Sequence, residues 1–162
     1  MIVGKQSKSG FFFRLVECNG MTRSIHDNLV VSYEVQCEAR RIVLHTEYHA
    51  FDKTTEYTNI VFTGVEGYHF ENDAFSNIIL NLEEVRVAQI VSEYYGQISE
   101  SYRKAGAPGP WAANLDSASE FLSKKGIKGF LLSSSIGLSG WVLAREVSIV
   151  PTSKSPRSPA DK

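Results

Sequence analysis

Two runs of sequence decide the fold: Arg40-Arg41-Ile42-Val43-Leu44-His45-Thr46-Glu47-Tyr48-His49 and Glu56-Tyr57-Thr58-Asn59-Ile60-Val61-Phe62-Thr63-Gly64-Val65. Both are rich in β-branched and aromatic residues, which favour strands. A short polar connection, residues 52–55, separates them. This pattern predicts a pair of antiparallel strands at the centre of the domain.

The two faces of the first strand differ in character. Side chains alternate between the faces of a strand, so every second residue shares a face. One face carries Ile42, Leu44, Thr46 and Tyr48, and the other carries Val43, His45, Glu47 and His49. We expect the first of these faces to point into the core.

Further strands surround this pair. Residues 29–38 predict the first strand of a hairpin that turns at residues 38–40. Gly64 interrupts the later run, and a bulge there would change the facing of the residues beyond it. Residues 75–85 predict a strand with three large apolar residues on one side, and a closing hairpin is predicted from residues 127–133 and 141–149. The three apolar residues are Ile78, Leu80 and Leu82.

The spacing of apolar residues predicts a long helix at residues 87–105. Ala88, Val91, Tyr95, Ile98 and Tyr102 recur every three or four residues and form one apolar stripe. A glycine in a helix is unfavourable, so the glycine at position 96 predicts close packing on the sheet.

A short second helix is predicted before the closing hairpin. Ser117 and Glu120 form a capping-box pattern that opens it, and Gly126 ends it. Strands first, helices next and a terminal hairpin indicate an α+β fold. We expect a curved antiparallel sheet of about six strands, with one long and one short helix packed on it.

The chain of 162 residues is long enough for one domain with its own core. We expect that domain at residues 21–150, after a poorly ordered N-terminal extension at residues 1–20 and before a disordered tail at residues 151–162. In the competing interpretation, residues 11–17 add a strand, with Asn19-Gly20 as its turn.

Composition narrows the classes of partner. The formal net charge is −1, so bulk electrostatics favour neither nucleic acid nor an anionic membrane. No apolar run approaches the roughly 20 residues of a membrane-spanning helix, and no signal peptide is recognisable. We therefore expect a cytoplasmic protein, with Cys18 and Cys37 as reduced thiols and no structural metal or cofactor.

A group of histidines and acids is the candidate site. His45, Glu47 and His49 share one strand face, and His69, Glu71 and Asp73 follow on a later strand. Three interpretations stay open: a solvated sheet face with cross-strand pairs, a partner-binding surface, and a metal or acid–base site. Alternate residues on a strand lie about 7 Å apart, too far for three ligands on one ion without help from another strand.

Trp111 lies in a loop of Pro and Gly at residues 107–111. An exposed tryptophan there would serve as an anchor for a partner, because aromatic residues are enriched at binding hot spots. In the other interpretation, its ring packs back over the end of the long helix.

Two segments carry a resemblance. Tyr68-His69-Phe70-Glu71-Asn72-Asp73 and residues 133–144 resemble small bacterial domains, some of which are similar to immunity proteins that neutralise a toxin. The resemblance covers about residues 24–149 and implies a class of protein, with no catalytic residue to carry over.

The expected function is therefore a non-enzymatic protein-binding domain that acts by occluding a protein partner, such as a toxin. The partner-binding residues would be His45, Glu47, His49, His69, Glu71, Asp73 and Trp111. The alternative is a small metal-dependent hydrolase that uses His45, His49, His69 and Glu71. A third possibility is a subunit of a homo-oligomer joined along sheet edges.

Overall fold

The computed structural model describes residues 24–52, 54–105 and 114–156. Within these residues the fold is α+β, as predicted, with eight strands and two helices. In chain order they are β1 (Leu29–Gln36), β2 (Arg41–His49), β3 (Thr55–Thr63), β4 (Gly67–Glu71), β5 (Asn77–Val85), α1 (Val87–Ala105), α2 (Leu115–Lys124), β6 (Lys128–Ile136), β7 (Ser139–Ala144) and β8 (Glu146–Thr152).

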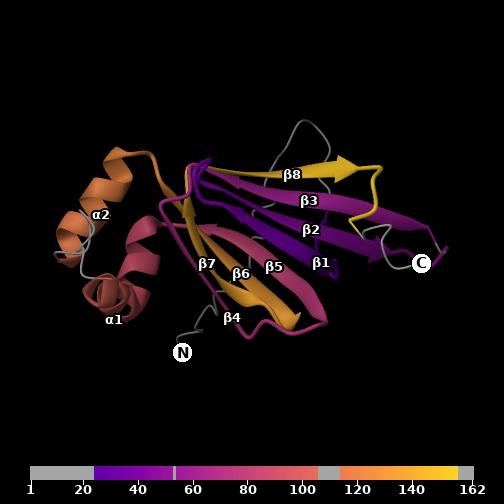
Figure 1. The fold of residues 1–162 in the computed structure, drawn as a ribbon, viewed down its shortest axis with the longest axis horizontal. Coiled ribbons are helices and arrows are strands. Elements are labelled where there is room, and N and C mark those ends of the chain that lie inside the picture. The colour runs from indigo at the N-terminus through magenta and orange to yellow at the C-terminus, as the bar shows by residue number, and fades with distance from the viewer. Residues whose placement is uncertain (1–23, 53, 106–113, 157–162) are drawn as a thin grey trace, which may run out of the picture.

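All described strands belong to one antiparallel sheet in the order β4-β7-β6-β5-β1-β2-β3-β8. β1 and β5 pair only at Leu29–Ile78 and Val30–Asn77, so the sheet divides there into two halves. The first half holds β1, β2, β3 and β8, and the second holds β5, β6, β7 and β4 (Figure 1). The predicted antiparallel sheet with two helices is confirmed, whereas the predicted number of about six strands is wrong, because the sheet has eight.

The chain passes between the halves at two neighbouring corners. It leaves β3 for β4 at residues 64–66, and it leaves β7 for β8 at Arg145. The Arg145 N–H donates to the Thr63 carbonyl at 3.0 Å, and the Glu66 N–H donates to the Leu143 carbonyl at 2.9 Å. Two predictions are thus corrected: Gly64 marks a corner rather than a bulge, and the predicted last strand is two strands that pair in different halves.

The main core lies between the two halves. β2 and β3 contribute Ile42, Leu44, Ile60 and Phe62, all fully buried. Phe62 meets Phe130 of β6 edge to face, with ring centroids 5.7 Å apart. Because three strands separate β3 from β6 in the sheet, this contact requires the halves to face each other. The predicted core face of the β2 strand is confirmed for Ile42, Leu44 and Thr46.

β5 departs from its predicted facing. Its register with β6 shifts around Ile79, at a β-bulge. Ile79 is fully buried, whereas Leu80 is 45% exposed. The prediction that Ile78, Leu80 and Leu82 share one side is wrong, because a bulge inserts a residue and reverses the alternation.

α1 and α2 lie together at one end of the molecule (Figure 1) and pack on the outer face of the second half. This second core contains Ile90, Val91 and Ile98 of α1, Leu122 of α2, and Trp141 and Leu143 of β7. The predicted bounds of α1 are confirmed, although Ala88 of the predicted stripe is exposed.

The close approach of α1 to the sheet lies at a different glycine from the predicted one. A Cβ on Gly96 would meet nothing within 4 Å, and this residue is exposed. A Cβ on Gly129 of β6 would instead lie 2.7 Å from Ile90 Cδ1. The helix therefore packs over a glycine of the strand.

The N-cap of α2 lies three residues before the predicted cap, Ser117. Asn114 is the N-cap, and its Oδ1 accepts from the Ser117 N–H at 2.8 Å. Ser117 then lies inside the first turn, and its hydroxyl also donates to Asn114 Oδ1. Asn and Ser are equally good N-caps, so sequence alone could not choose between them.

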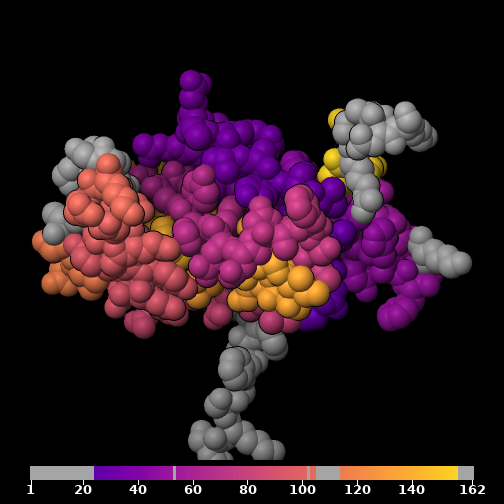
Figure 2. Space-filling model, turned by 60° about the horizontal axis from the view of Figure 1, so that its bottom comes forward, coloured from indigo at the N-terminus to yellow at the C-terminus, as the bar shows by residue number. Residues whose placement is uncertain are grey.

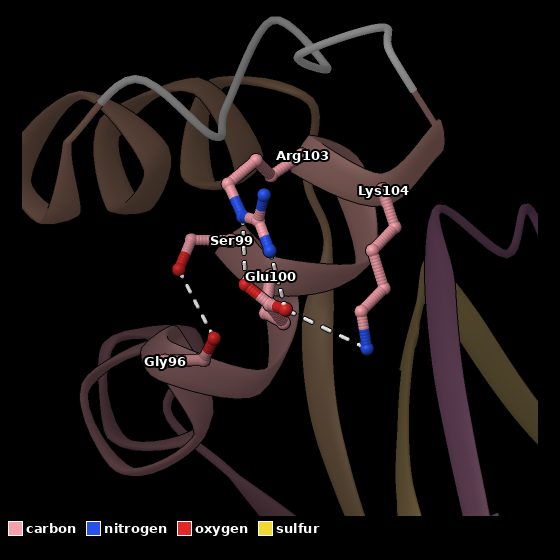
Figure 3. A network of polar contacts seen from close by, with 5 residues as sticks. All are labelled: Gly96, Ser99, Glu100, Arg103 and Lys104. Atoms are coloured by element: carbon pink, nitrogen blue, oxygen red, sulfur yellow. Dashed lines mark hydrogen bonds and ion pairs between the residues drawn. The ribbon is translucent and has the colours of Figure 1, made fainter.

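Charged residues cover the exposed end of α1. Glu100 accepts from Arg103 at 2.7 Å and pairs with Lys104 at 3.5 Å, and Ser99 donates to the Gly96 carbonyl (Figure 3). The hydrogen bond from Arg103 lowers the pKa of the Glu100 carboxyl below its ordinary value. Both pairs span one helical turn, which suits i,i+3 and i,i+4 contacts.

The predicted domain limits are only partly covered. The extension at residues 1–20 lies outside the described residues, as does Cys18, while Cys37 is an exposed free thiol. β8 runs to Thr152, which pairs with Tyr57, so the predicted domain end at residue 150 falls inside a strand. Among the described residues, no helix is both long and apolar enough to cross a membrane.

Candidate functional site

The predicted site residues divide into two separate groups. His45, Glu47 and His49 lie on β2, and His69 and Glu71 lie on β4. Four strands, β7, β6, β5 and β1, lie between β4 and β2 in the sheet. The β2 group is on the outer face of the first half, whereas His69 faces the helices on the outer face of the second half. The structure therefore does not bring these five predicted residues together.

His45 is held by its neighbours in the sheet. Its Nδ1 lies 2.9 Å from Oδ1 of Asn59, the residue directly opposite on β3. Its Nε2 lies 3.7 Å from the Glu34 carboxylate on β1. These contacts are the cross-strand pairs expected of a polar sheet face.

Glu47 and His49 form a second pair on the same face. The Glu47 carboxylate lies 3.1 Å from His49 Nε2, and His49 Nδ1 lies 3.2 Å from the Thr55 hydroxyl. Glu47 is buried, with 2% of its surface exposed. The outer face of β2 thus presents histidines whose ring nitrogens already have partners.

The residues around β4 form a more exposed site. Tyr68 is 44% exposed, and its ring lies 5.5 Å from that of Phe70, which in turn meets Tyr33 of β1 at 5.6 Å. The Tyr33 hydroxyl donates to the Asp73 carboxylate at 3.2 Å. Burial, and then this bond to Asp73, raises the pKa of Tyr33. Three aromatic rings and the Asp73 carboxylate therefore lie together across β4 and β1.

Asn77 fixes the turn that carries Asp73. Its Nδ2 donates to Asp73 at 2.9 Å, and its Oδ1 accepts from the N–H groups of Ala74 and Leu138. Only 6% of Asn77 is exposed. One buried amide thus joins the β4–β5 connection to the turn between β6 and β7.

His69 lies against the second core. It is directly opposite Trp141 on β7, and the two rings stack with centroids 6.3 Å apart. The side-chain amide nitrogen of Gln97 on α1 lies 3.0 Å from His69 Nε2. The Glu71 carboxylate lies 3.7 Å from the same Nε2.

A pocket of about 190 Å³ opens beside this histidine. It lies where β4, β7 and α1 meet, and its lining residues are Gly67, Tyr68, His69, Gln97, Ile98, Ser101 and Trp141. Pockets for drug-sized ligands usually measure about 300–1,000 Å³, so this pocket suits only a fragment or one side chain.

The segment that holds β4 and β5 is acidic in sequence. Residues 67–85 contain Glu71 and Asp73 at the end of β4, Glu83 and Glu84 on β5, and no lysine or arginine. Glu84 pairs with Lys128 of β6 at 3.0 Å. Burial, and then the charges of Glu93 and Glu71, raise the pKa of Tyr94 on α1. We call Tyr68, His69, Glu71, Asp73 and Glu93 the acidic β4 surface. Figure 2 shows the magenta atoms of the segment around residues 60–80 beside those of α1 on one face.

Some residues of this site escaped sequence reasoning. Gln97 is one polar residue among many on α1, and Trp141 reads as an ordinary strand residue. Only the pairing of β4 with β7 and the packing of α1 bring them to His69. The predicted anchor Trp111 lies outside the described residues.

The predicted metal ligands do not come together among the described residues. Among the described residues, no group of three or more His, Cys, Asp or Glu side chains is placed to hold a metal ion. His45 and His49 lie on the opposite outer face from His69 and Glu71, so these four residues do not surround a common point.

Comparisons with known proteins give no relative. No family model matches this chain, and no curated protein and no solved structure matches it either.

Proposed function

We propose that this protein is a non-enzymatic binding domain that occludes a basic surface of a protein partner. The observation that carries the proposal is the acidic β4 surface, where exposed aromatic rings and carboxylates stand together without a lysine or arginine between residues 67 and 85. Complementary charge of this kind steers association and selects partners. Tyrosine is among the residues enriched at binding hot spots, as is arginine, which a carboxylate on the opposite surface can bind.

The position of β4 supports the same proposal. Within the described residues, β4 is an edge strand with a single strand neighbour, β7. An edge strand offers unpaired backbone groups, to which an extended segment of a partner can add. Backbone pairing would supply affinity, and Glu71 and Tyr68 would supply selectivity.

The role that fits best is that of an immunity-type protein, whose partner is a toxin with a basic functional surface. Occlusion requires no catalytic group in the binding domain. The rival, a metal-dependent hydrolase, would need His45, His49, His69 and Glu71 to converge, and the two strands that carry them are not neighbours.

The test compares two variants of equal charge change in co-purification from the native host, followed by mass spectrometry. The double variant Glu71→Lys/Glu93→Lys reverses two carboxylates of the acidic β4 surface. The control Glu38→Lys/Glu146→Lys reverses two exposed carboxylates elsewhere, in the β1–β2 turn and on β8.

We expect wild type and control to retain the same partner and the first variant to lose it. With the purified partner, the first variant should bind at least tenfold more weakly, and added salt should narrow the difference. Equal retention by both variants would place the interface elsewhere. Turnover of a substrate by the isolated chain would refute the non-enzymatic function.

A further inference from the structure

An apolar row crosses the outer face of the sheet where its two halves join. Leu29 of β1 is directly opposite Ile78 of β5, and Ile78 is directly opposite Ile136 of β6. Residues directly opposite each other share a face of the sheet. Leu29 also pairs with Glu47, which places these residues on the outer face. We call Leu29, Ile78 and Ile136 the apolar row.

The two described cores leave the apolar row uncovered. Among the described residues, neither core contains any of its three members. The helices pack around Val85 at the end of β5, whereas Ile78 lies at its start. Ile136 is 54% exposed, and Leu80, at the nearby bulge, is 45% exposed. Neighbouring exposed apolar side chains of this kind mark a surface that another segment or molecule covers.

The chain enters the described structure beside the apolar row. The Asp27 N–H donates to the Ile79 carbonyl at 2.9 Å, and Leu29 follows two residues later. Residues 1–23 come before this point and lie outside the described residues. An extended chain spans about 23 Å from residue 17 to residue 24, whereas three neighbouring strands span about 10 Å. Residues 11–17 can therefore reach every member of the row.

The sequence of this segment complements the row in polarity and in charge. Residues 11–17 read Phe-Phe-Phe-Arg-Leu-Val-Glu, with five apolar side chains of seven. Residues 1–23 contain four basic residues and a single acid. The described segments around the row, residues 24–36 and 77–85, contain four acids and no lysine or arginine, and of these acids Glu84 is already paired with a lysine. Apolar contact would supply the attraction, and the charges would favour it.

We propose that residues 11–17 cover the apolar row of their own chain, with the phenylalanine rings on Ile78 and Ile136. A tethered segment has an effective concentration on the order of 1 mM, so it competes well against any molecule that must bind from solution. A second copy would also bring its own acids against those around the row. The N-terminal segment is then part of the domain rather than a poorly ordered extension. This inference needs no protein partner, so it does not rest on the proposed function.

Cys18 offers a test, because it directly follows the segment and can carry a nitroxide spin label. The label is attached to the full chain in a Cys37→Ser background, since Cys37 is an exposed free thiol. A spin label broadens the NMR signals of methyl groups close to it. The signals to compare are those of the apolar row and that of Leu122 on α2, which lies with α1 beyond the other end of β5 (Figure 1).

We expect the label to broaden the signals of the apolar row and to leave that of Leu122 unchanged. Phe11→Ser/Phe12→Ser/Phe13→Ser should reduce the paramagnetic relaxation at the row by about threefold or more, because three apolar rings are lost. The control Ile2→Ser/Val3→Ser removes apolar side chains from the same extension, outside residues 11–17, and should change nothing. Should the triple variant not fold, Ile136→Ser tests the same contact from the side of the row.

Three results would overturn the proposal. The first is a set of row signals no broader than that of Leu122, which would leave the row open to another molecule. The second is broadening in a mixture of spin-labelled chains with isotope-labelled chains that carry no spin label, which would assign the contact to a second copy. The third is equal broadening in the parent, the triple variant and the control. None of these results bears on the charge-reversal test of the proposed partner, so the two proposals fail independently.

Discussion

A Cβ atom on Gly140 would lie 2.0 Å from the carbonyl oxygen of His69. Gly140 also has a φ of +150°, a conformation that side chains disfavour. The glycine thus allows β4 to pair with β7 and brings His69 over Trp141. Gly140→Ala should detach β4 and destabilise the fold by several kcal/mol.

Thermal unfolding and the NMR signals of residues 67–71 measure this effect. The control is Gly96→Ala, where a Cβ meets nothing within 4 Å in an exposed helix. That change should stabilise the protein by up to about 1 kcal/mol. A Gly140→Ala protein with unchanged stability and intact β4 signals would contradict the close approach.

Asn77 is expected to be the most sensitive polar residue near the site. Asn77→Ala leaves the N–H groups of Ala74 and Leu138 without their acceptor and removes the donor to Asp73. The buried Leu138 N–H left without an acceptor costs about 1–3 kcal/mol and the two more exposed bonds add less, so a total of about 2–4 kcal/mol is expected. Denaturant unfolding measures the loss in free energy of unfolding, and faster hydrogen exchange at the Leu138 N–H would show that the loss arises at this bond. Asn81→Ala on the same strand is the control and should change little.

The Thr46 hydroxyl on β2 joins β3 to the segment that precedes β1. It accepts from Asn28 Nδ2 at 2.8 Å and donates to the Thr58 carbonyl at 2.8 Å, with Asn28 and Thr46 buried. Thr46→Val keeps the shape but leaves both partners unsatisfied, so it should cost about 1–3 kcal/mol. The melting temperature should fall by about 2–4 °C per kcal/mol. Thr63→Val, at a half-buried position on β3, should have a much smaller effect.

The pair between Glu100 and Arg103 should make the stability of α1 depend on pH. Because this bond lowers the pKa of Glu100 in the folded state, its contribution is present above the unfolded pKa and is lost as pH falls through the folded pKa. Glu100→Gln should therefore lower the melting temperature slightly at neutral pH and not at strongly acidic pH. Salt should reduce the difference, because the pair is on the surface.

The control for this experiment is Glu38→Gln, which removes an exposed carboxylate in the β1–β2 turn. It should leave the melting temperature nearly unchanged at either pH. A Glu100→Gln effect that persists in acid would assign the loss to helix propensity rather than to the ion pair.

Local patterns predicted local structure well and long-range structure poorly. The alternation in β2 and the spacing in α1 follow from which residues meet water, so the core face of Ile42 and Leu44 and the bounds of α1 were predictable. The bulge at Ile79 and the corner at Gly64 depend on partners far along the chain. No local pattern could show that β8 pairs with β3 while β7 pairs with β6.

The same limit applies to the candidate site. The alternation of side chains along a strand correctly predicted that His45 and His49 share one face of β2. It could not predict that four strands separate β4 from β2 in the sheet. His69 was named for its neighbours in sequence, whereas the structure gives it Gln97 and Trp141. Whether residues 69, 71 and 73 contact a partner remains a prediction for the charge-reversal experiment.

The pairing of β8 with β3 has a consequence for biosynthesis. β3 is complete at Thr63, but β8, which pairs with its second edge, ends only at Thr152. While the ribosome makes the intervening segment, β3 stays an open edge that can pair with other nascent chains. A chain cut before Glu146 should retain that edge permanently, and it should aggregate during expression even though both helices and seven strands have been made.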